Sequence, residues 1–277
     1  SDVIEIIVYD VFSVGNFYNR TDSDSRFVRH DSGTLGTDNF IAGNNAGDSI
    51  TSGGNYNTVV GNEAGTALTT GDNNVAVGFE ALKTEDTGQN NVAVGYRAMN
   101  VANYDGSGNN VAVGADAGLS MTTGIFNTFV GALSGDAHTE GYNNVAIGTN
   151  ALGADVSSRA TVAIGSSSLS SQNNTNTDAY NTAVGFASGS SVTTGVKNTL
   201  IGGLAGDAQT TATANTCVGY GALGANTTGQ SNVAVGENAL GNYNVTDGSE
   251  SFNTALGYRA GLSVTTGTEN TLIGALA

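Results

Sequence analysis

A short pattern recurs along this chain from about residue 39 to its end, and its spacing constrains the fold more than any other feature. Residues 74–82, NVAVGFEAL, form one copy. There are fourteen copies, and nine of the thirteen steps between their glycines are 17 residues long. We call these the rung glycines: Gly43, Gly61, Gly78, Gly95, Gly114, Gly131, Gly148, Gly165, Gly185, Gly202, Gly219, Gly236, Gly257 and Gly274. A fixed period of this size predicts a solenoid, in which each copy buries its apolar face only by stacking on its neighbours.

The three longest steps are themselves periodic. The steps that follow Gly95, Gly165 and Gly236 have 19, 20 and 21 residues, so a longer loop follows every fourth copy. The fourth residue after the rung glycine keeps the same rhythm, with two glycines and then two large apolar residues in each block of four. We therefore predict that a module of four rungs, about 71 residues long, has been duplicated.

Three positions of each copy accept few residue types. Four residues before the rung glycine stands Asn in thirteen copies, with Thr161 as the exception. The residue just before the glycine is always Ala, Val, Ile or Leu, and the third residue after it is always Ala or Ser. A position that accepts nothing larger than Ser indicates that two backbones approach closely there, so we expect a thin interior.

Within one rung we predict a strand, a tight turn, a second strand and a loop. The alternation in residues 75–77 places Val75 and Val77 on one face, taken as the interior, and Ala76 on the other. Gly78 permits a sharp reversal, and Ala81 with Leu82 is expected to begin the return strand. The Asn residues would stack into a ladder whose amides bond from rung to rung. At about 4.8 Å per rung, such a body would be roughly 60 Å long.

Composition excludes several classes of function. The formal net charge is -16, with only eight Lys and Arg residues, so binding to nucleic acid or to an anionic membrane surface is not expected. No apolar run has the length of a membrane span, and the first residues do not resemble a secretion signal. Cys217, the only cysteine, is expected to be a small buried apolar residue.

No pattern of catalytic residues stands out, so we expect neither an enzyme nor a bound cofactor. The only histidines are His30, near the N-terminus, and His138, expected on the surface of a loop. They suggest no Ser-His-Asp or Cys-His arrangement. Acidic loops such as 105–108 and 246–250 could bind Ca²⁺ through oxygen ligands, but solvated turns are the simpler interpretation.

The longer loops are the better candidates for a binding function, because loops on a rigid scaffold often carry binding sites. Each places a Tyr among Asn and Asp, a mixture suited to contacts with sugars. The candidate receptor contacts are Tyr104, Asp105, Tyr180, Tyr243 and Asn244. The alternative is that each Tyr covers the seam between two modules.

The N-terminal region differs from the repeats. Residues 3–12 are rich in β-branched and aromatic types and predict a strand that pairs with another chain or a mounting partner. Residues 18–27 resemble an element often repeated in bacteriophage tail fibres, an aromatic residue followed by basic, Thr, acidic and further charged positions. The matching residues are Tyr18, Arg20, Thr21, Asp22, Asp24, Arg26 and Phe27. We divide the chain into an attachment or trimerisation segment, 1–36, and a repetitive β-roll, 37–277.

The repeats themselves resemble the head domain of trimeric autotransporter adhesins. The matching words are residues 91–95, 144–148 and 232–236, although the rung here is longer than in that family. The resemblance implies an all-β, left-handed parallel β-roll or β-solenoid packed as a homotrimer. Trimer packing would cover the face expected to carry Ala76. Apolar layers across the trimer axis would be formed by residues at equivalent rungs of successive modules, Phe129, Leu200 and Leu272.

Similar repeats also occur in phage tail-fibre proteins, and with the N-terminal element this favours a phage fibre. The expected protein is part of a virion, made in the host cytoplasm and exposed to the medium. Its N-terminus would attach to a tail or baseplate component, and its body would bind or support binding to a glycan or protein of the host surface. A bacterial surface adhesin of the same fold and a monomeric ice-binding solenoid remain as alternatives.

Overall fold

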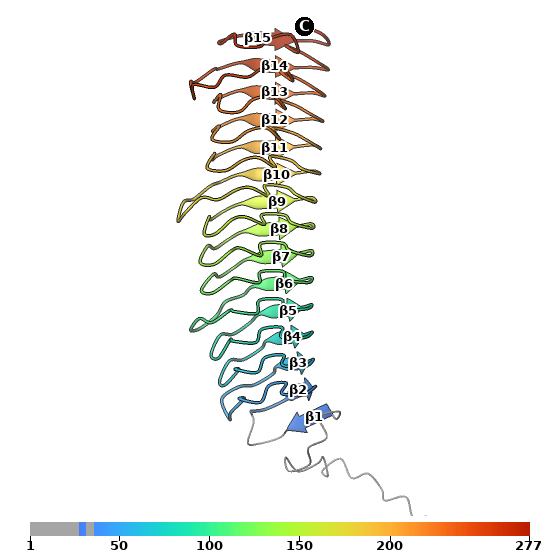
Figure 1. Cartoon of the computed structure of the whole chain (residues 1–277), viewed down its shortest axis with the longest axis vertical. Helices are drawn as coiled ribbons and strands as arrows, with labels where there is room; N and C mark the ends of the chain where they lie inside the picture. The colour runs from blue at the N-terminus through green and yellow to red at the C-terminus, as the bar shows by residue number, and fades with distance from the viewer. Residues whose placement is uncertain (1–27, 32–35) are drawn as a thin grey trace, which may run out of the picture.

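The computed structural model of the chain describes residues 28–31 and 36–277 (Figure 1). The strand predicted at 3–12 and the element at 18–27 lie outside the described residues. Strand β1 (Val28–Asp31) pairs antiparallel with β2, and β2 to β15 stack in chain order as fourteen parallel strands of one sheet. Their bounds are β2 Asn39–Ala42, β3 Thr58–Val60, β4 Val75–Val77, β5 Val92–Val94, β6 Val111–Val113, β7 Thr128–Val130, β8 Val145–Ile147, β9 Val162–Ile164, β10 Thr182–Val184, β11 Thr199–Ile201, β12 Thr216–Val218, β13 Val233–Val235, β14 Thr254–Leu256 and β15 Thr271–Ile273. The predicted all-β solenoid is confirmed.

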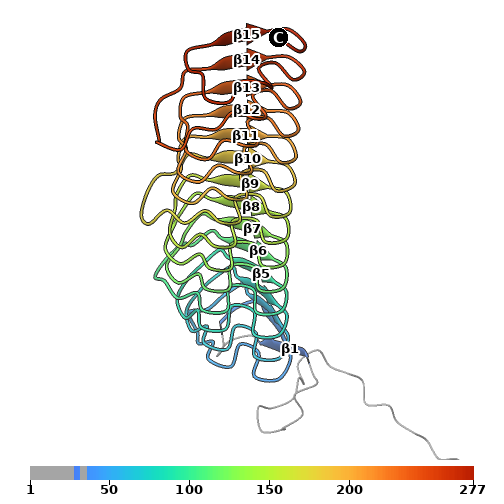
Figure 2. The same cartoon turned by 45° about the horizontal axis from the view of Figure 1, so that its top comes forward.

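The strands keep one register along the whole stack. Val75 pairs with Val92, and across the 19-residue step Val92 pairs with Val111 in the same way. The extra residues of the longer steps therefore leave the stack as loops, which project from the edge where the chain enters the strands (Figure 1). Figure 2 shows the rungs superposed along one axis, with these loops again on one side.

Strand β1 covers the first edge of the parallel sheet. Its residues Val28 and Asp31 pair with Ala42 and Asn39 of β2. An uncovered edge strand offers its N–H and C=O groups to other chains, so this antiparallel strand blunts that edge.

The return half of each rung contains no strand in the described residues, so the predicted second strand is wrong. Leu82 has φ +52° and Glu80 has φ +54°, both in the left-handed region. Two such residues within three positions bend the chain twice and prevent an extended run. The rungs are nevertheless joined here as well, because the Leu82 N–H donates to the Ala98 carbonyl at 3.0 Å.

The interior is lined by the middle residue of each strand, which reverses the predicted orientation. Ala76 is fully buried, whereas Val75 and Val77 point outward and are half-buried. Likewise Phe129 and Leu200 fill the coil rather than an axis between chains, and Leu272 packs partly buried against the same core. A thin coil has room for Ala at most rungs, while the β-branched residues cover one another along the outside of the sheet.

Complementary sizes inside the coil explain the four-rung module. Phe129 lies against Gly118 and Gly135, where an added Cβ would sit 3.1 and 2.8 Å from its ring. One rung further on the sizes exchange, with Ala146 on the strand and Leu152 on the return side, both fully buried. No rung has a large residue at both positions, and Phe129 also fills the space beside Gly118 in the preceding rung, where the strand residue is Ala112.

The Asn ladder is present, and most of its bonds join side chain to backbone. The N–H of Asn74 donates to Oδ1 of Asn57 at 2.8 Å, and Asn74 Oδ1 accepts the N–H of Asn91 at 3.0 Å. Across the coil, Asn74 Nδ2 donates to the Gly88 carbonyl at 2.8 Å. The ladder breaks at Thr161, where Gln172 bridges the gap by donating to Thr161 Oγ1 and accepting from Asn181 Nδ2.

The rung glycines are required by conformation and by space. Gly78 has φ +133°, and a Cβ built on it would collide with the carbonyl of Gly95 in the next rung. The rung glycines from Gly43 to Gly257 stack in the same way, so a side chain at any of them would separate two rungs.

Candidate interaction surface

The outward residues of the strands form one continuous surface, which we call the strand face. It consists of the residues one and three positions before each rung glycine. These are Ala42, Val60, Val77, Val94, Val113, Val130, Ile147, Ile164, Val184, Ile201, Val218, Val235, Leu256 and Ile273, and Phe40, Thr58, Val75, Val92, Val111, Thr128, Val145, Val162, Thr182, Thr199, Thr216, Val233, Thr254 and Thr271. The strand face contains no charged residue, and several members, such as Ile147 and Leu256, are exposed.

Exposed aromatic residues border the strand face on both sides. Where the chain enters the strands, the fifth residue before the rung glycine forms a leading margin. Where it leaves them, the residue after the glycine forms a trailing margin. The exposed aromatic residues of the leading margin are Tyr56, Phe126, Tyr180 and Phe252, and those of the trailing margin are Phe79, Tyr96, Phe186, Tyr220 and Tyr258. Phe79 and Tyr96 stack on consecutive rungs, with ring centroids 5.5 Å apart.

This surface accounts for most of the exposed apolar side chains of the described residues. The exposed large apolar residues outside it are Val101, Leu133, Tyr142 and Leu276. Contiguous exposed apolar area above a few hundred Å² typically marks a site of interaction. The strand face is therefore the principal candidate for a functional surface.

The five candidate residues of the longer loops differ in accessibility. Tyr104 and Tyr243 are buried, so their rings line the seams between modules and leave no surface for a receptor. Asp105 is exposed and accepts a hydrogen bond from Thr87 Oγ1 at 2.8 Å. Asn244 is half-buried and accepts from Thr227, and Tyr180 is 55% exposed. Of the three tyrosines, Tyr180 alone presents its ring to solvent.

Tyr180 belongs to a polar group that we call the Arg159 cluster, formed by Tyr142, Arg159, Asn176, Asp178 and Tyr180. The Arg159 guanidinium lies over the Tyr142 ring, 4.8 Å from its centroid. Its Nη2 donates to Asn176 Oδ1 at 3.4 Å, and Nη1 is 4.0 Å from Asp178 Oδ1. Tyr180 donates its hydroxyl to Asp178 Oδ2 at 3.3 Å, and the Asp178 charge raises the pKa of Tyr180, with a smaller contribution from Tyr142. The cluster thus brings three successive rungs together at the leading edge.

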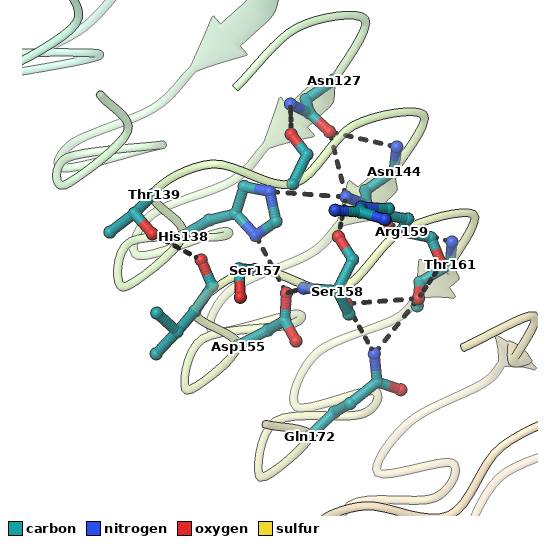
Figure 3. Close-up of polar contacts among 12 residues, drawn as sticks. Asn127, His138, Thr139, Asn144, Asp155, Ser157, Ser158, Arg159, Thr161 and Gln172 are labelled. Atoms are coloured by element: carbon teal, nitrogen blue, oxygen red, sulfur yellow. Dashed lines mark hydrogen bonds and ion pairs between the residues drawn. The ribbon is translucent and has the colours of Figure 1, made fainter. Parts of the chain in front are cut away.

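A second polar group lies inside the coil (Figure 3). His138 is fully buried, which corrects its predicted place on a loop surface. Its Nδ1 is 2.9 Å from Asp155 Oδ2, and its Nε2 is 3.4 Å from Asn144 Nδ2. Because the Asn amide is a donor, the neutral tautomer with hydrogen on Nδ1 satisfies both contacts. Its ring also meets Phe129 edge to face, with centroids 5.4 Å apart.

The buried group has the residue types of a catalytic triad without its geometry. Ser158 donates its backbone N–H to Asp155 at 3.2 Å, while its Oγ accepts from Gln172 Nε2 at 3.0 Å. Figure 3 shows the hydroxyl directed at Gln172 and Thr161 and away from the imidazole. All of these side chains are fully buried, so the group is part of the core.

Other buried titratable groups are also enclosed. Burial raises the pKa of Cys217 to about 12, so the side chain remains a thiol packed in the core, as predicted. Burial likewise raises the pKa of Glu85 from 4.5 to about 7, against a hydrogen bond from the Gly88 N–H. In residues 28–31 and 36–277, no group of three or more His, Cys, Asp or Glu side chains could hold a metal ion. The same residues include no helix of the length and hydropathy that a membrane span requires.

The Arg159 cluster was missed by sequence reasoning, although a signal for part of it exists. Tyr142 and Arg159 occupy the same position of consecutive copies, six residues before their rung glycines. Equivalent positions of adjacent rungs lie next to each other in a solenoid. Aligning the copies at this position would have placed the two side chains together.

The comparisons with known proteins add no identification: no family model, no curated protein and no solved structure matches this chain.

Proposed function

We propose that this chain is a structural fibre segment in which three copies pack side by side through their strand faces. The observation that carries the proposal is the strand face itself, which stays uncharged over fourteen strands while the chain as a whole has a net charge of -16. A long uncharged surface on a strongly acidic molecule points to a partner that covers it. A second and third copy of the same rod match it in length and in rise per rung.

Parallel packing of the copies suits the shape of the molecule. Three rods around an axis parallel to their own would bring their strand faces together and leave the longer loops at the periphery. Such cyclic symmetry also places all N-termini at one end. The aromatic residues of the trailing margin would then pack against the neighbouring copy, as aromatic anchors do in stable interfaces. The leading margin, which includes Tyr180, would face outward with the longer loops.

The resemblance of residues 18–27 to tail-fibre elements supports a place in a phage particle. In this proposal the N-terminal segment, 1–36, mounts the trimer on a tail or baseplate component. The solenoid extends toward the host surface, in the extracellular medium, and contributes to attachment. Three copies of a weak receptor contact would give useful avidity. The body has structural and binding roles and is not an enzyme.

The first experiment is the mass of the purified particle by light scattering. We expect a value near three times 27.6 kDa that persists on dilution. A monomer would leave the strand face without an occupant and would overturn the proposal.

A monomer would direct attention to ice binding, which one observation favours. Seven strands carry Thr three positions before the rung glycine, so Thr and β-branched residues repeat at the fixed rise of the sheet. The hydroxyls of the loop threonines are less suited to this role, since Thr69 and Thr210 donate theirs to carbonyls of the next rung. Thermal hysteresis and ice-crystal shaping by the monomer would test this alternative. A bacterial surface adhesin would have the same trimeric architecture, and binding of the trimer to phage tail components would distinguish the two.

A further inference from the structure

Positively charged side chains are scarce on this molecule, and they fall into two groups according to their ion pairs. In residues 36–277, Lys83 lies 2.6 and 2.7 Å from the carboxylates of Glu63 and Glu80, and Arg97 lies 2.8 Å from Asp116. By contrast, the nearest carboxylate oxygen to Arg159 is 4.0 Å away. Lys197 forms no ion pair within this part of the chain. Arg259 likewise forms no ion pair within residues 36–277. Lys83 and Arg97 are therefore neutralised locally, whereas Arg159, Lys197 and Arg259 remain available to a ligand.

Arg159 and Lys197 lie on the same small area of the surface. The N–H of Lys197 donates to the Ala179 carbonyl at 2.7 Å, which places Lys197 one rung beyond Tyr180 in the leading margin. Tyr180 is joined to Asp178, and Asp178 faces Arg159. The Arg159 cluster and Lys197 thus span rungs seven to ten, with two positive groups, one carboxylate and two tyrosine rings.

The donors of Arg159 are poorly used by the protein. Its Nη2 contact with Asn176 is 3.4 Å long, and its Nη1 is 4.0 Å from Asp178, so both terminal nitrogens can still pair with a ligand. Its Nε is buried without a hydrogen-bond partner, as is that of Arg259, and is not counted as a donor to the ligand. Stacking on Tyr142 fixes the plane of the guanidinium. A planar fork held in this way is suited to pair bidentately with a carboxylate.

We propose that the Arg159 cluster, with Lys197, binds a saccharide that carries a carboxylate. Arg159 would pair with the carboxylate and Lys197 would add a second positive charge. The Tyr180 ring, 55% exposed, would pack against the apolar face of a pyranose, and Asn176 and Asp178 would bond to its hydroxyls. This inference rests on the proposed function, because it names the class of host glycan that the fibre would contact. The position of the cluster beside the strand face leaves it accessible when the copies pack through that face.

The experiment uses the full chain on an array of sialic- and uronic-acid oligosaccharides, each paired with a neutral analogue whose carboxylate is reduced to an alcohol. We expect retention of acidic members and binding at least about tenfold weaker for their neutral partners, as expected for the loss of one charged hydrogen-bonded pair. Arg159→Gln should weaken binding by a similar factor, and Lys197→Gln and Tyr180→Ala, both at exposed sites, should weaken it several-fold.

Arg259→Gln is the matched control, because Arg259 also stacks on a tyrosine, Tyr258, at 4.9 Å. It removes the same charge from a pair that lacks the second ring and the neighbouring lysine, so glycan binding should not change. Equal retention of acidic and neutral members, no retention of acidic members, or an equal loss with Arg259→Gln would each overturn the inference. A trimer without acidic-glycan binding would overturn this inference alone, whereas a monomer that binds would overturn only the proposed trimer.

Discussion

Asparagine is the residue that sets the geometry of each rung, because one side chain connects in two directions. Asn74 accepts a backbone N–H from the next rung and donates across the coil to the loop that closes its own rung. Asp or Leu could not make both contacts, since an ionised Asp has no hydrogen-bond donor and the Leu side chain has neither a donor nor an acceptor. The position is fully buried, so every unmade bond there would leave a polar group without water.

We therefore predict that Asn74→Ala destabilises the solenoid by roughly 3 kcal/mol, because the N–H of Asn91 and the carbonyl of Gly88 lose their partners. The measurement is urea unfolding followed by circular dichroism. The matched control is Asn73→Gly, which changes the adjacent exposed residue and keeps its positive φ of +58° accessible. Equal unfolding midpoints for the two variants would contradict the role of the ladder.

Glu85 predicts a pH dependence of stability whose sign follows from its raised pKa. Below pH 4.5 the carboxyl is protonated in both the folded and the unfolded chain. Between pH 4.5 and about 7 it ionises only in the unfolded chain, so its contribution to the free energy of unfolding falls with rising pH. The loss is complete above that window and amounts to at most roughly 3 kcal/mol.

Glu85→Gln should remove this slope and make the protein more stable than the parent above pH 7. The melting temperature of each protein at pH 4.5 and pH 8 gives the comparison. Glu237→Gln, at an exposed site, is the control and should leave the difference between the two pH values unchanged. A parent and a Glu85→Gln variant with the same pH dependence would show that Glu85 is ionised in the folded state.

Several of these residue positions could be predicted from the sequence alone. The Asn column, the stacked glycines and the Ala or Ser column were predictable, because each position accepts few residue types. The inward face of the strand could not be predicted, since the alternation in residues 75–77 defines two faces without indicating which one is buried. The burial of His138 could have been inferred, because His138, Asp155 and Gln172 each stand seven residues after a rung glycine and are therefore neighbours on consecutive rungs.

At the scale of the element, a rung is one three-residue strand closed by turns. Glu80 and Leu82 adopt left-handed conformations although they carry side chains. Seven copies have Gly at the position of Leu82, all with positive φ, and these glycines were the signal in the sequence for a bend. The predicted return strand is wrong because every copy that includes this position bends there, whether the residue is Gly, Leu or Met. What specifies the fold at this scale is the match between the strand residue and the fourth residue after the rung glycine. Where one is large, the other is small.

This match predicts a compensating pair of substitutions in β7. Phe129→Ala alone should cost about 3–5 kcal/mol through the cavity it leaves, and Gly135→Leu alone about 1–3 kcal/mol through overpacking against Phe129. The double variant copies the pairing of Ala146 with Leu152 and should lose at least about 1 kcal/mol less than the sum of the two. Unfolding of all four proteins measures the coupling, and strictly additive losses would contradict the complementarity.

On the scale of the whole molecule, the fourteen rungs generate a surface that none of them has alone. A single Val on a strand is an ordinary half-exposed residue, whereas a column of Val, Ile and Leu repeated along the sheet is an extended apolar stripe. Its existence followed from the repeat in the sequence, but its outward direction required the structure. The same repetition accounts for the sparse placement of charge, which lies outside the stripe.

The final prediction separates assembly from folding by placing one charge on the strand face. Ile147 is 37% exposed at mid-length, so a lysine there can reach water in an isolated chain but is enclosed when three copies pack together. Ile147→Lys should therefore keep the circular dichroism spectrum and reduce the mass in solution from three copies to one. Thr123→Lys adds the same charge at an exposed turn away from the strands and should remain trimeric. If Ile147→Lys stays trimeric, the strand face is not the contact between copies. Loss of the trimer in both variants would point instead to sensitivity to net charge.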